Sequence, residues 1–273
     1  MHSLPTPEPL ADGISGRVQP GPGDAVLWLH GYTLDATSWA EMWRLLPGWH
    51  HIGIDLPGHG ASEPLRADSD LIAVGDRLGE LCHVYNVRHL VALSFGTIAS
   101  LQLLMQQPGL LSSAVLGAPA IAGGPTEPSM ATVYFQMTML FRMAGRTDAL
   151  TRLWMGSRAW RGVHSRPGLH DTLAAIVKRH RWDELSDPAK AAQLKEPAQA
   201  YEALEAIDTP LLLLLGEHEM PAFRQCADIL EQRVASCRQV LLPDTDHLCM
   251  LQSPEPSALL IDEHLRAHAT DVP

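Results

Sequence analysis

The stretch His89-Leu90-Val91-Ala92-Leu93-Ser94-Phe95-Gly96 decides how this chain folds. A short run of mostly apolar residues ends at Ser94, and the pattern of a helix, Gly96–Gln107, begins directly after it. Such a run is typical of a strand that is buried on both faces of a parallel sheet. A sharp turn from strand to helix exposes the serine hydroxyl, and the helix N-terminus favours negative charge beside it. The stretch therefore predicts an α/β sheet with Ser94 as a candidate nucleophile.

Further short apolar runs, each followed by turn residues, predict the other strands of this sheet: Ala25–Leu29, His51–Ile54, Ala114–Leu116, Leu211–Leu215 and Gln239–Leu242. Helical patterns cover Asp70–Tyr85 and Pro256–His268. The first 23 residues are rich in proline and glycine and predict an extended lead-in, with at most a short strand at Ile14–Val18. The alternation of strand and helix predicts a mostly parallel, doubly wound sheet.

The regular spacing breaks once, where about ninety residues separate the strands at Ala114–Leu116 and Leu211–Leu215. Helices are predicted in this interval at Ser129–Ala144, Asp148–Met155, Leu169–Trp182 and Pro188–Ala206. We interpret the interval as a helical cap inserted before the strand at residues 211–215. The predicted organisation is a core formed by residues 1–120 and 207–273, with a cap formed by residues 121–206.

The first predicted cap helix, Ser129–Ala144, carries apolar residues on all sides, which predicts burial on more than one side. Two interpretations remain open. The apolar residues pack the cap against the core, or part of this surface lines an apolar substrate pocket, where methionine adapts to varied shapes. In the second interpretation Phe135, Met139 and Trp154 are the candidate substrate-binding residues.

Composition excludes several classes of function. The chain has 273 residues, of which 46% are hydrophobic and 19% charged, as in an ordinary soluble globular protein. A formal net charge of −11 argues against binding to nucleic acid or to an anionic membrane surface. The longest purely apolar run, Leu211–Leu215, is far too short to cross a bilayer, so we expect no membrane insertion.

The expected location of the protein is cytoplasmic. The first residues, MHSLPTPEPL, lack the basic and apolar regions of a signal peptide. The four cysteines, Cys82, Cys226, Cys237 and Cys249, form no CxxC pair and match no zinc site, which predicts free thiols in a reducing compartment. The composition leaves the oligomeric state open.

Four further motifs accompany the serine stretch: His30-Gly31-Tyr32, Asp55-Leu-Pro-Gly-His59-Gly60-Ala-Ser62, Gly216-Glu217-His218-Glu219 and Pro243-Asp244-Thr245-Asp246-His247. With these motifs in this order, the chain resembles the α/β-hydrolase superfamily, in its branch of capped serine esterases and hydrolases. The resemblance spans Ala25 to His268. The chain departs from the usual G-x-S-x-G pattern, because Ala92 replaces the first glycine and Thr97 stands where a further glycine is common.

The resemblance implies a catalytic triad in the chain order Ser94, Glu219, His247. Glu217 is the alternative for the acid. The backbone N–H groups of Tyr32 and Phe95 would form the oxyanion hole. The same resemblance gives the segment Asp55–Ser62, with His59, a structural role.

These residues predict a serine hydrolase that cleaves an ester, thioester or related carbonyl bond of a largely apolar small molecule. An alternative keeps the triad for a non-hydrolytic or carbon–carbon bond-cleaving reaction, as in a lyase, cyclase or acyltransferase. A third possibility is a ligand-binding protein on a hydrolase fold. No histidine pairing suggests a metal site, and no phosphate-binding glycine motif suggests a nucleotide, so no metal or cofactor is expected.

Overall fold

The computed structural model describes residues 4–66 and 70–269. Within these residues the chain forms an eight-stranded sheet in the order β1-β2-β4-β3-β5-β6-β7-β8. The strands are β1 (Glu8–Ala11), β2 (Ile14–Gln19), β3 (Ala25–Leu29), β4 (His50–Ile54), β5 (Val87–Leu93), β6 (Ser113–Gly117), β7 (Leu211–Gly216) and β8 (Cys237–Leu242). Every pair from β4 to β8 is parallel, whereas β2 pairs antiparallel with both β1 and β4. The prediction of a mostly parallel, doubly wound sheet is confirmed.

The central strands are buried on both faces. Every residue of β3, β6 and β7 is buried, as expected for apolar strands in the middle of a parallel sheet. The short strand expected at Ile14–Val18 is β2. The expected lead-in contains one more strand, β1, which pairs with β2. Its Pro9 has no N–H to donate, so this segment can join the sheet only at an edge.

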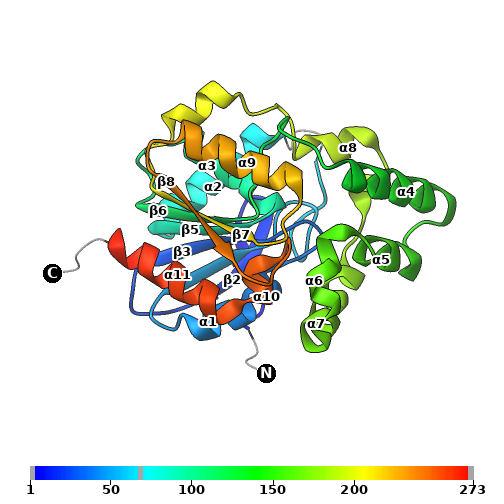
Figure 1. Ribbon diagram of the computed structural model, residues 1–273, viewed down its shortest axis with the longest axis horizontal. Helices are drawn as coiled ribbons and strands as arrows, with labels where there is room; N and C mark the ends of the chain where they lie inside the picture. Colours follow the sequence, from blue (N-terminus) through cyan, green and yellow to red (C-terminus); the bar gives the residue numbers. More distant parts are fainter. Residues whose placement is uncertain (1–3, 67–69, 270–273) are drawn as a thin grey trace.

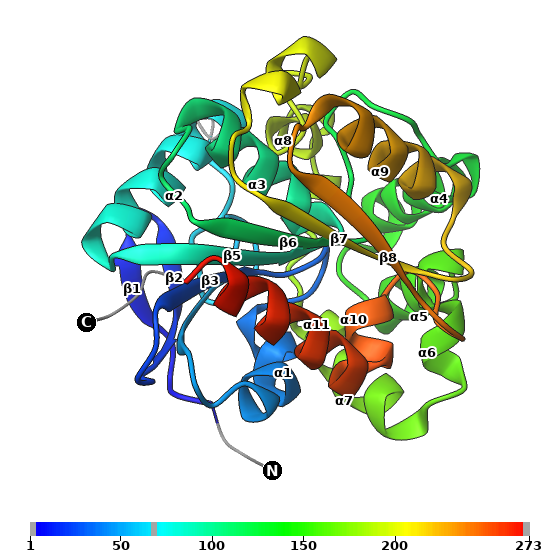
Figure 2. The ribbon, with the colours of Figure 1, turned by 60° about the vertical axis from the view of Figure 1, so that its left-hand side comes forward.

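Helices cover both faces of the sheet, as Figure 2 shows. One face carries α2 (Leu71–Val84), α3 (Phe95–Gln106) and α9 (Pro221–Arg233), and the other carries α1 (Ala40–Leu45), α10 (Cys249–Gln252) and α11 (Pro254–Ala267). Asp70 caps α2, because its side chain accepts a hydrogen bond from the N–H of Ala73 at 2.8 Å. Because β3 to β8 run parallel, their carboxyl ends lie on one edge of the sheet.

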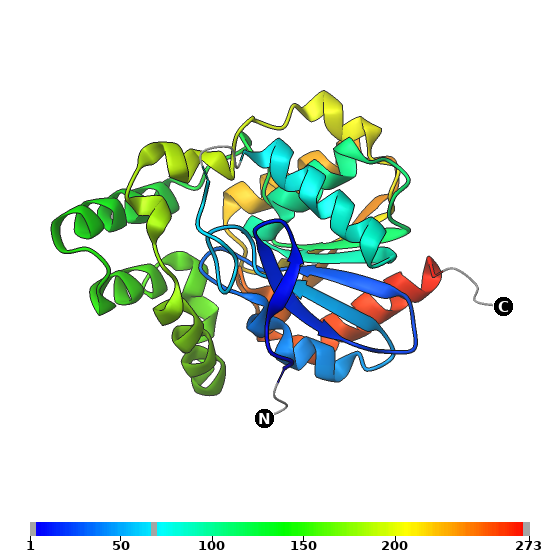
Figure 3. The same cartoon turned by 180° about the vertical axis from the view of Figure 1, so that it is seen from behind.

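A second group of helices lies beside that edge, as Figures 1 and 3 show from opposite sides. It comprises α4 (Pro128–Ala144), α5 (Asp148–Met155), α6 (Arg161–His164), α7 (Pro167–Arg179) and α8 (Pro188–Gln193), with short 3₁₀ turns at Arg158–Trp160 and Asp183–Leu185. The single helix expected over Pro188–Ala206 is wrong. It is split into α8 and a 3₁₀ turn at Tyr201–Ala206, because Pro197 in between has no N–H and breaks the helical ladder. We call the helices and turns of residues 128–193 the cap. The turn at Tyr201–Ala206 contacts α3 and α9 instead.

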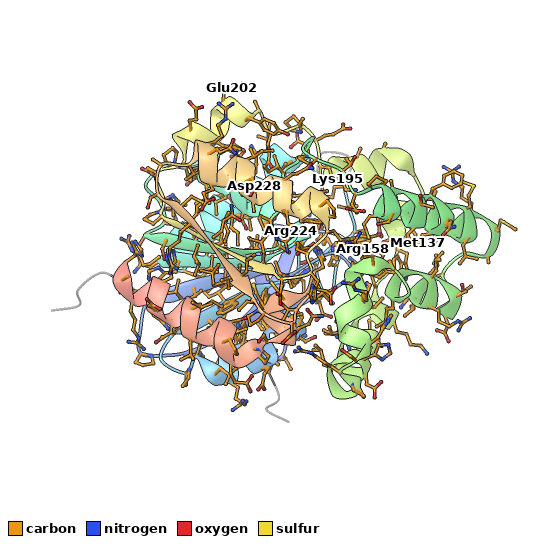
Figure 4. All side chains as sticks on the ribbon, in the orientation of Figure 1. Met137, Arg158, Lys195, Glu202, Arg224 and Asp228 are labelled. Atoms are coloured by element: carbon orange, nitrogen blue, oxygen red, sulfur yellow. The ribbon has the colours of Figure 1, made fainter. Side chains whose placement is uncertain are left out.

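The burial expected for the first cap helix is only partly right. Met137 is its one buried residue and packs among the other cap helices, where Figure 4 labels it. Phe135 and Met143 are 64% and 87% exposed. The reason is that much of the apolar surface of α4 faces a cavity rather than packed protein.

All four cysteines are free, and three of them are buried. Among residues 4–66 and 70–269, no helix combines the length and apolar character needed to cross a membrane.

Candidate active site

Ser94 stands at the sharp turn between β5 and α3. Its φ of 51° and ψ of −116° lie outside the ordinary regions for a residue with a side chain. The N–H of Ser94 donates to the carbonyl of Gly117 on β6 at 2.7 Å, which holds the turn against the sheet. Strained backbone of this kind persists only where the surrounding structure enforces it, and it occurs frequently at functional sites.

The residues two positions on either side of Ser94 explain how the turn fits. A Cβ on Gly96 would lie 2.6 Å from the carbonyl oxygen of His30, so only glycine lets α3 approach β3 this closely. Ala92 is fully buried and lies in register between Leu29 of β3 and Leu116 of β6. The turn therefore forms with alanine at the position where the usual motif has glycine.

Three side chains from distant parts of the sequence meet at this turn. The Oγ of Ser94 lies 2.7 Å from Nε2 of His247, and Nδ1 of His247 lies 2.9 Å from Oε1 of Glu219. All three residues are buried. A carboxylate accepts hydrogen bonds but cannot donate them, so Nδ1 of a neutral His247 carries the proton and donates to Glu219, while Nε2 accepts from the serine hydroxyl. The structure thus brings together the three residues expected to form the triad.

The loop after β7 sets Glu219 and Glu217 apart. Oε1 of Glu219 also accepts from the N–H of Met220 at 2.8 Å, which orients the carboxylate toward His247. Glu217 is exposed, and its carboxylate accepts instead from the N–H of Asp244 at 3.0 Å. Arg224, labelled in Figure 4, donates to the carbonyls of Gly216, Glu217 and Glu219 and so braces the loop. Only Glu219 is placed to orient the imidazole.

The two expected oxyanion donors flank Ser94 on different elements. Phe95 is the first residue of α3, so its N–H has no partner within the helix. Tyr32 belongs to the loop of residues 30–35 that follows β3, and we call this segment the β3 loop. A Cβ on Gly31 would lie 3.7 Å from Cβ of Ser94, which places the β3 loop directly beside the turn.

The Asp55–Ser62 segment packs against the β3 loop. Asp55 accepts hydrogen bonds from the N–H groups of Ala36 and Ala61 at 2.8 and 2.7 Å. His30 accepts from the N–H of Leu56 at 3.0 Å. His59 lines the cavity described below and is buried, and burial together with nearby His180 holds its pKa well below the ordinary value. His59 is therefore a neutral ring in the wall of the site.

A cavity of about 650 Å³ lies between the cap and the core, with Ser94 and His247 in its wall. Its lining is mainly apolar and comes from both parts: Ile98, Ala120, Met130, Leu194, Met220 and Phe223. Of the three candidate substrate-binding residues, Phe135 and Trp154 line this cavity, whereas Met139 is not among the lining residues. Met139 lies one turn beyond Phe135 on α4, and the sequence alone does not show where the cavity ends along the helix.

A buried polar cluster in the cavity wall was not anticipated. The Tyr32 hydroxyl donates to Oε1 of Glu184 at 2.5 Å, and Nε2 of His180 lies 3.1 Å from the same oxygen. Burial raises the pKa of Glu184, but the hydrogen bonds from His180 and Tyr32 outweigh it and leave the pKa below its ordinary value. The sequence gives no signal for this pair. His180 and Glu184 are four residues apart, but α7 ends before them and Trp182 between them has a φ of 64°, so helical spacing does not apply.

One group of side chains has the composition of a cation site. The ligand atoms of Glu217, His218 and Asp244 all lie within 4.8 Å of one another, but all three residues are exposed. None of them lines the cavity.

Comparison with known proteins identifies the family. A model of the alpha/beta hydrolase family matches residues 26–259. The chain belongs to this family. A 2-succinyl-6-hydroxy-2,4-cyclohexadiene-1-carboxylate synthase from Enterobacter sp. (strain 638) is 24% identical over 266 residues, which cover 95% of this chain and 99% of that protein.

Solved structures show the same fold. A thermophilic esterase from Thermogutta terrifontis superposes with a TM-score of 0.78 at 22% identity, over 94% of this chain and 95% of the esterase. MenH from S. aureus superposes with a TM-score of 0.79 at 17% identity, over 93% of this chain and 98% of MenH. At these identities the structural likeness establishes the fold, and family membership supports an enzyme.

Proposed function

We propose that this α/β hydrolase cleaves an ester, thioester or related carbonyl bond of a largely apolar small molecule through an acyl-enzyme on Ser94. The observation that carries the proposal is the continuous chain of hydrogen bonds from Ser94 through His247 to Glu219, with Ser94 and His247 lining the cavity. A hydrogen-bond chain of this kind activates a hydroxyl that is otherwise a weak nucleophile.

The reaction follows from these contacts. His247 takes the proton of the Ser94 hydroxyl while the oxygen attacks the carbonyl carbon of the substrate. The N–H groups of Tyr32 and Phe95 stabilise the resulting oxyanion. As the intermediate collapses, His247 returns the proton to the leaving alcohol or thiol. A water molecule, deprotonated by the same imidazole, then releases the acid from Ser94.

The cavity supports a substrate with an apolar acyl or alcohol part. A volume of about 650 Å³ falls within the range of small-molecule sites. Most of the cavity surface is apolar, and Ser94 and His247 are among the polar residues that line it. The likeness of the fold to an esterase agrees with this substrate class.

A second reaction is favoured by one specific observation. The relative from Enterobacter is named for a product with a succinyl chain and a ring carboxylate, so that product carries two carboxyl groups. Recognition of two carboxylates calls for cationic partners. Lys190 and Lys195 line the cavity, and Lys195, labelled in Figure 4, lies where the cap meets the core. A non-hydrolytic reaction of an anionic substrate at the same Ser94 and His247, as in a lyase, is therefore the second candidate.

The deciding experiment measures turnover of p-nitrophenyl esters of increasing chain length by the wild type and by Ser94→Ala. We expect turnover with a burst of p-nitrophenol, labelling of Ser94 by a fluorophosphonate, and loss of both in the variant. Hydrolysis that survives Ser94→Ala unchanged would refute the proposal.

The second candidate has its own measurement. A 2-succinylbenzoate is an aromatic dicarboxylate of similar outline to the named product, and its inhibition of ester turnover can be compared with that of its dimethyl ester. Inhibition that favours the dicarboxylate and weakens in Lys190→Ala and Lys195→Ala supports an anionic substrate and so the second candidate. Equal inhibition by both compounds removes it.

A further inference from the structure

The cap holds the β3 loop through three side-chain hydrogen bonds to nearly consecutive residues. The Tyr32 hydroxyl donates to Glu184 at 2.5 Å, and Nε1 of Trp154 donates to Oγ1 of Thr33 at 2.7 Å. Two residues further on, Asp35 accepts from the guanidinium of Arg179 at 2.8 Å. The partners come from different parts of the cap, namely α5, the end of α7 and the Asp183–Leu185 turn. The β3 loop is thus fixed from several directions by one neighbouring layer.

The three contacts differ in their exposure to water: the Trp154–Thr33 contact is buried, and the contacts of Tyr32 and Asp35 are partly buried. Glu184 and Trp154 are 8% and 6% exposed, and Thr33 is 1% exposed. The Arg179 side chain is 54% exposed, so its ion pair with Asp35 is weakened by water. The hydrogen bonds made by Glu184 and Trp154 therefore account for most of the hold on the loop.

Thr33 shows that the β3 loop needs this support. Its φ is 64°, which is a rare conformation for a β-branched residue. The Thr33 hydroxyl donates to the carbonyl of Tyr32 at 2.6 Å while it accepts from Trp154. The same hydroxyl therefore ties the strained backbone of the loop to the cap. Strain of this kind is retained only where neighbouring contacts impose it.

Tyr32 joins the cap to the candidate oxyanion site within one residue. Its side chain meets Glu184, and its backbone N–H is one of the two groups that the proposed mechanism aims at the oxyanion. Burial and the nearby Glu184 carboxylate raise the pKa of Tyr32 well above its ordinary value, so the hydroxyl keeps its proton and remains a donor at neutral pH.

We infer that Glu184 and Trp154 of the cap are positioning residues that hold the Tyr32 N–H in the direction of the oxyanion. The inference rests on the proposed acyl-enzyme function. The cap then does more than enclose substrate, because it sets the geometry of a transition-state contact in the core. Oxyanion donors act only within a narrow range of distance and direction, so a small shift of the loop lowers kcat more than it raises KM.

The test uses variants that each remove one of these hydrogen bonds. Tyr32→Phe removes the hydroxyl, and Trp154→Phe removes the indole N–H but keeps an aromatic ring beside Tyr32. For each we expect kcat for p-nitrophenyl butyrate to fall about tenfold with KM changed less than about twofold, a part of the roughly 10²–10³-fold that a whole donor provides. Glu184→Leu is expected to behave likewise. Glu184→Gln keeps an oxygen for both donors and is expected to stay within about threefold of wild type.

A second readout separates positioning from a general structural role. Butylboronic acid forms a tetrahedral adduct on the serine that resembles the transition state, so its affinity is expected to fall by the same factor as kcat/KM across the variants. Arg146→Ala is the control, because Arg146 is in the cap and, among the described residues, its side chain donates a hydrogen bond to the carbonyl of Lys178 and none to the β3 loop. We expect it to leave kcat and boronate affinity unchanged.

The outcomes distinguish the two levels of the argument. If the wild type does not hydrolyse the ester, or if Ser94→Ala hydrolyses it as fast as the wild type, the proposed function fails. If the wild type and Arg146→Ala are active while Tyr32→Phe, Trp154→Phe and Glu184→Leu keep kcat and boronate affinity within twofold, only the positioning inference is overturned. A rise in KM with unchanged boronate affinity overturns it as well, since it would assign these residues to substrate binding.

Discussion

Gly96→Ala tests whether the close approach of α3 to β3 is required for activity. In the wild type, a Cβ at this position would lie 2.6 Å from the carbonyl oxygen of His30 and 2.7 Å from that of Leu29. Both obstacles are backbone atoms, which cannot rotate away as a side chain can. Ordinary contact begins near 3.4 Å, so the helix or the strand must move by about 0.8 Å.

The magnitude follows from two opposing terms. Forcing a methyl group into packed structure costs about 1–3 kcal/mol. Replacing glycine by alanine in a helix stabilises the folded state by about 0.5–1 kcal/mol, because alanine loses less conformational entropy on folding. We expect a net loss of about 1–2 kcal/mol in unfolding free energy. His30 directly precedes Gly31 and Tyr32, so the displacement reaches the β3 loop, and a shift of this size costs about 100-fold in kcat.

Urea unfolding and p-nitrophenyl ester turnover measure the two effects. Gly168→Ala is the control, because a Cβ there meets no heavy atom within 4 Å and the residue lies in α7 of the cap. We expect this control to leave kcat unchanged and to raise stability by up to about 1 kcal/mol. If Gly96→Ala keeps both wild-type stability and wild-type kcat, the reasoning about the tight turn is refuted.

Three further predictions address the acid, the cavity and the core. Glu219→Gln is expected to lower kcat by about 10³–10⁴-fold, whereas Glu217→Gln leaves it unchanged; the reverse result in steady-state kinetics would move the acid to Glu217. Phe135→Ala is expected to raise KM for long-chain esters with a change in unfolding free energy under about 0.5 kcal/mol, because the side chain lines the cavity and is 64% exposed. Met139→Ala is expected to leave KM unaltered. A KM for long-chain esters that Phe135→Ala does not change would contradict this. Burial lowers the pKa of His51 to about 4, against about 6.5 in an unfolded chain, so only the unfolded state binds the proton in this interval. Unfolding free energy should therefore fall as pH drops from about 6.5 to about 4, by up to about 1.4 kcal/mol per unit from this residue, and His51→Gln should flatten the slope of urea stability against pH by one proton.

The sheet and the Ser94 turn were accessible from the sequence because their signals are local. A continuous apolar run such as Leu211–Leu215 is too short for a typical helix and therefore indicates a strand. Ser94, between β5 and α3, is recognisable because the apolar pattern of a strand changes there to the pattern of a helix. The chain order of Ser94, Glu219 and His247 added a constraint that single motifs lack, and in the structure the three side chains are in contact.

The cap was less accessible because its residues are placed by tertiary contacts. Helical periodicity indicates which face of α4 is apolar, but it does not tell a face that packs from a face that lines a cavity, as Phe135 and Met139 show. The contact between Tyr32 and Glu184 joins positions 152 residues apart and has no local signature. β1 was missed because Glu8-Pro9-Leu10-Ala11 lacks the composition of a strand and is extended by pairing with β2.

The three hydrogen bonds between cap and β3 loop also bear on how such enzymes can be recombined. A cap taken from a relative would bring its own partners for residues 32, 33 and 35, while the core would retain those of this chain. A chimera that exchanges residues 128–193 alone would thus separate each donor from its acceptor, although both halves could fold. The unit to transfer between relatives is therefore the cap together with the β3 loop, two segments that are far apart in sequence but are linked by these hydrogen bonds.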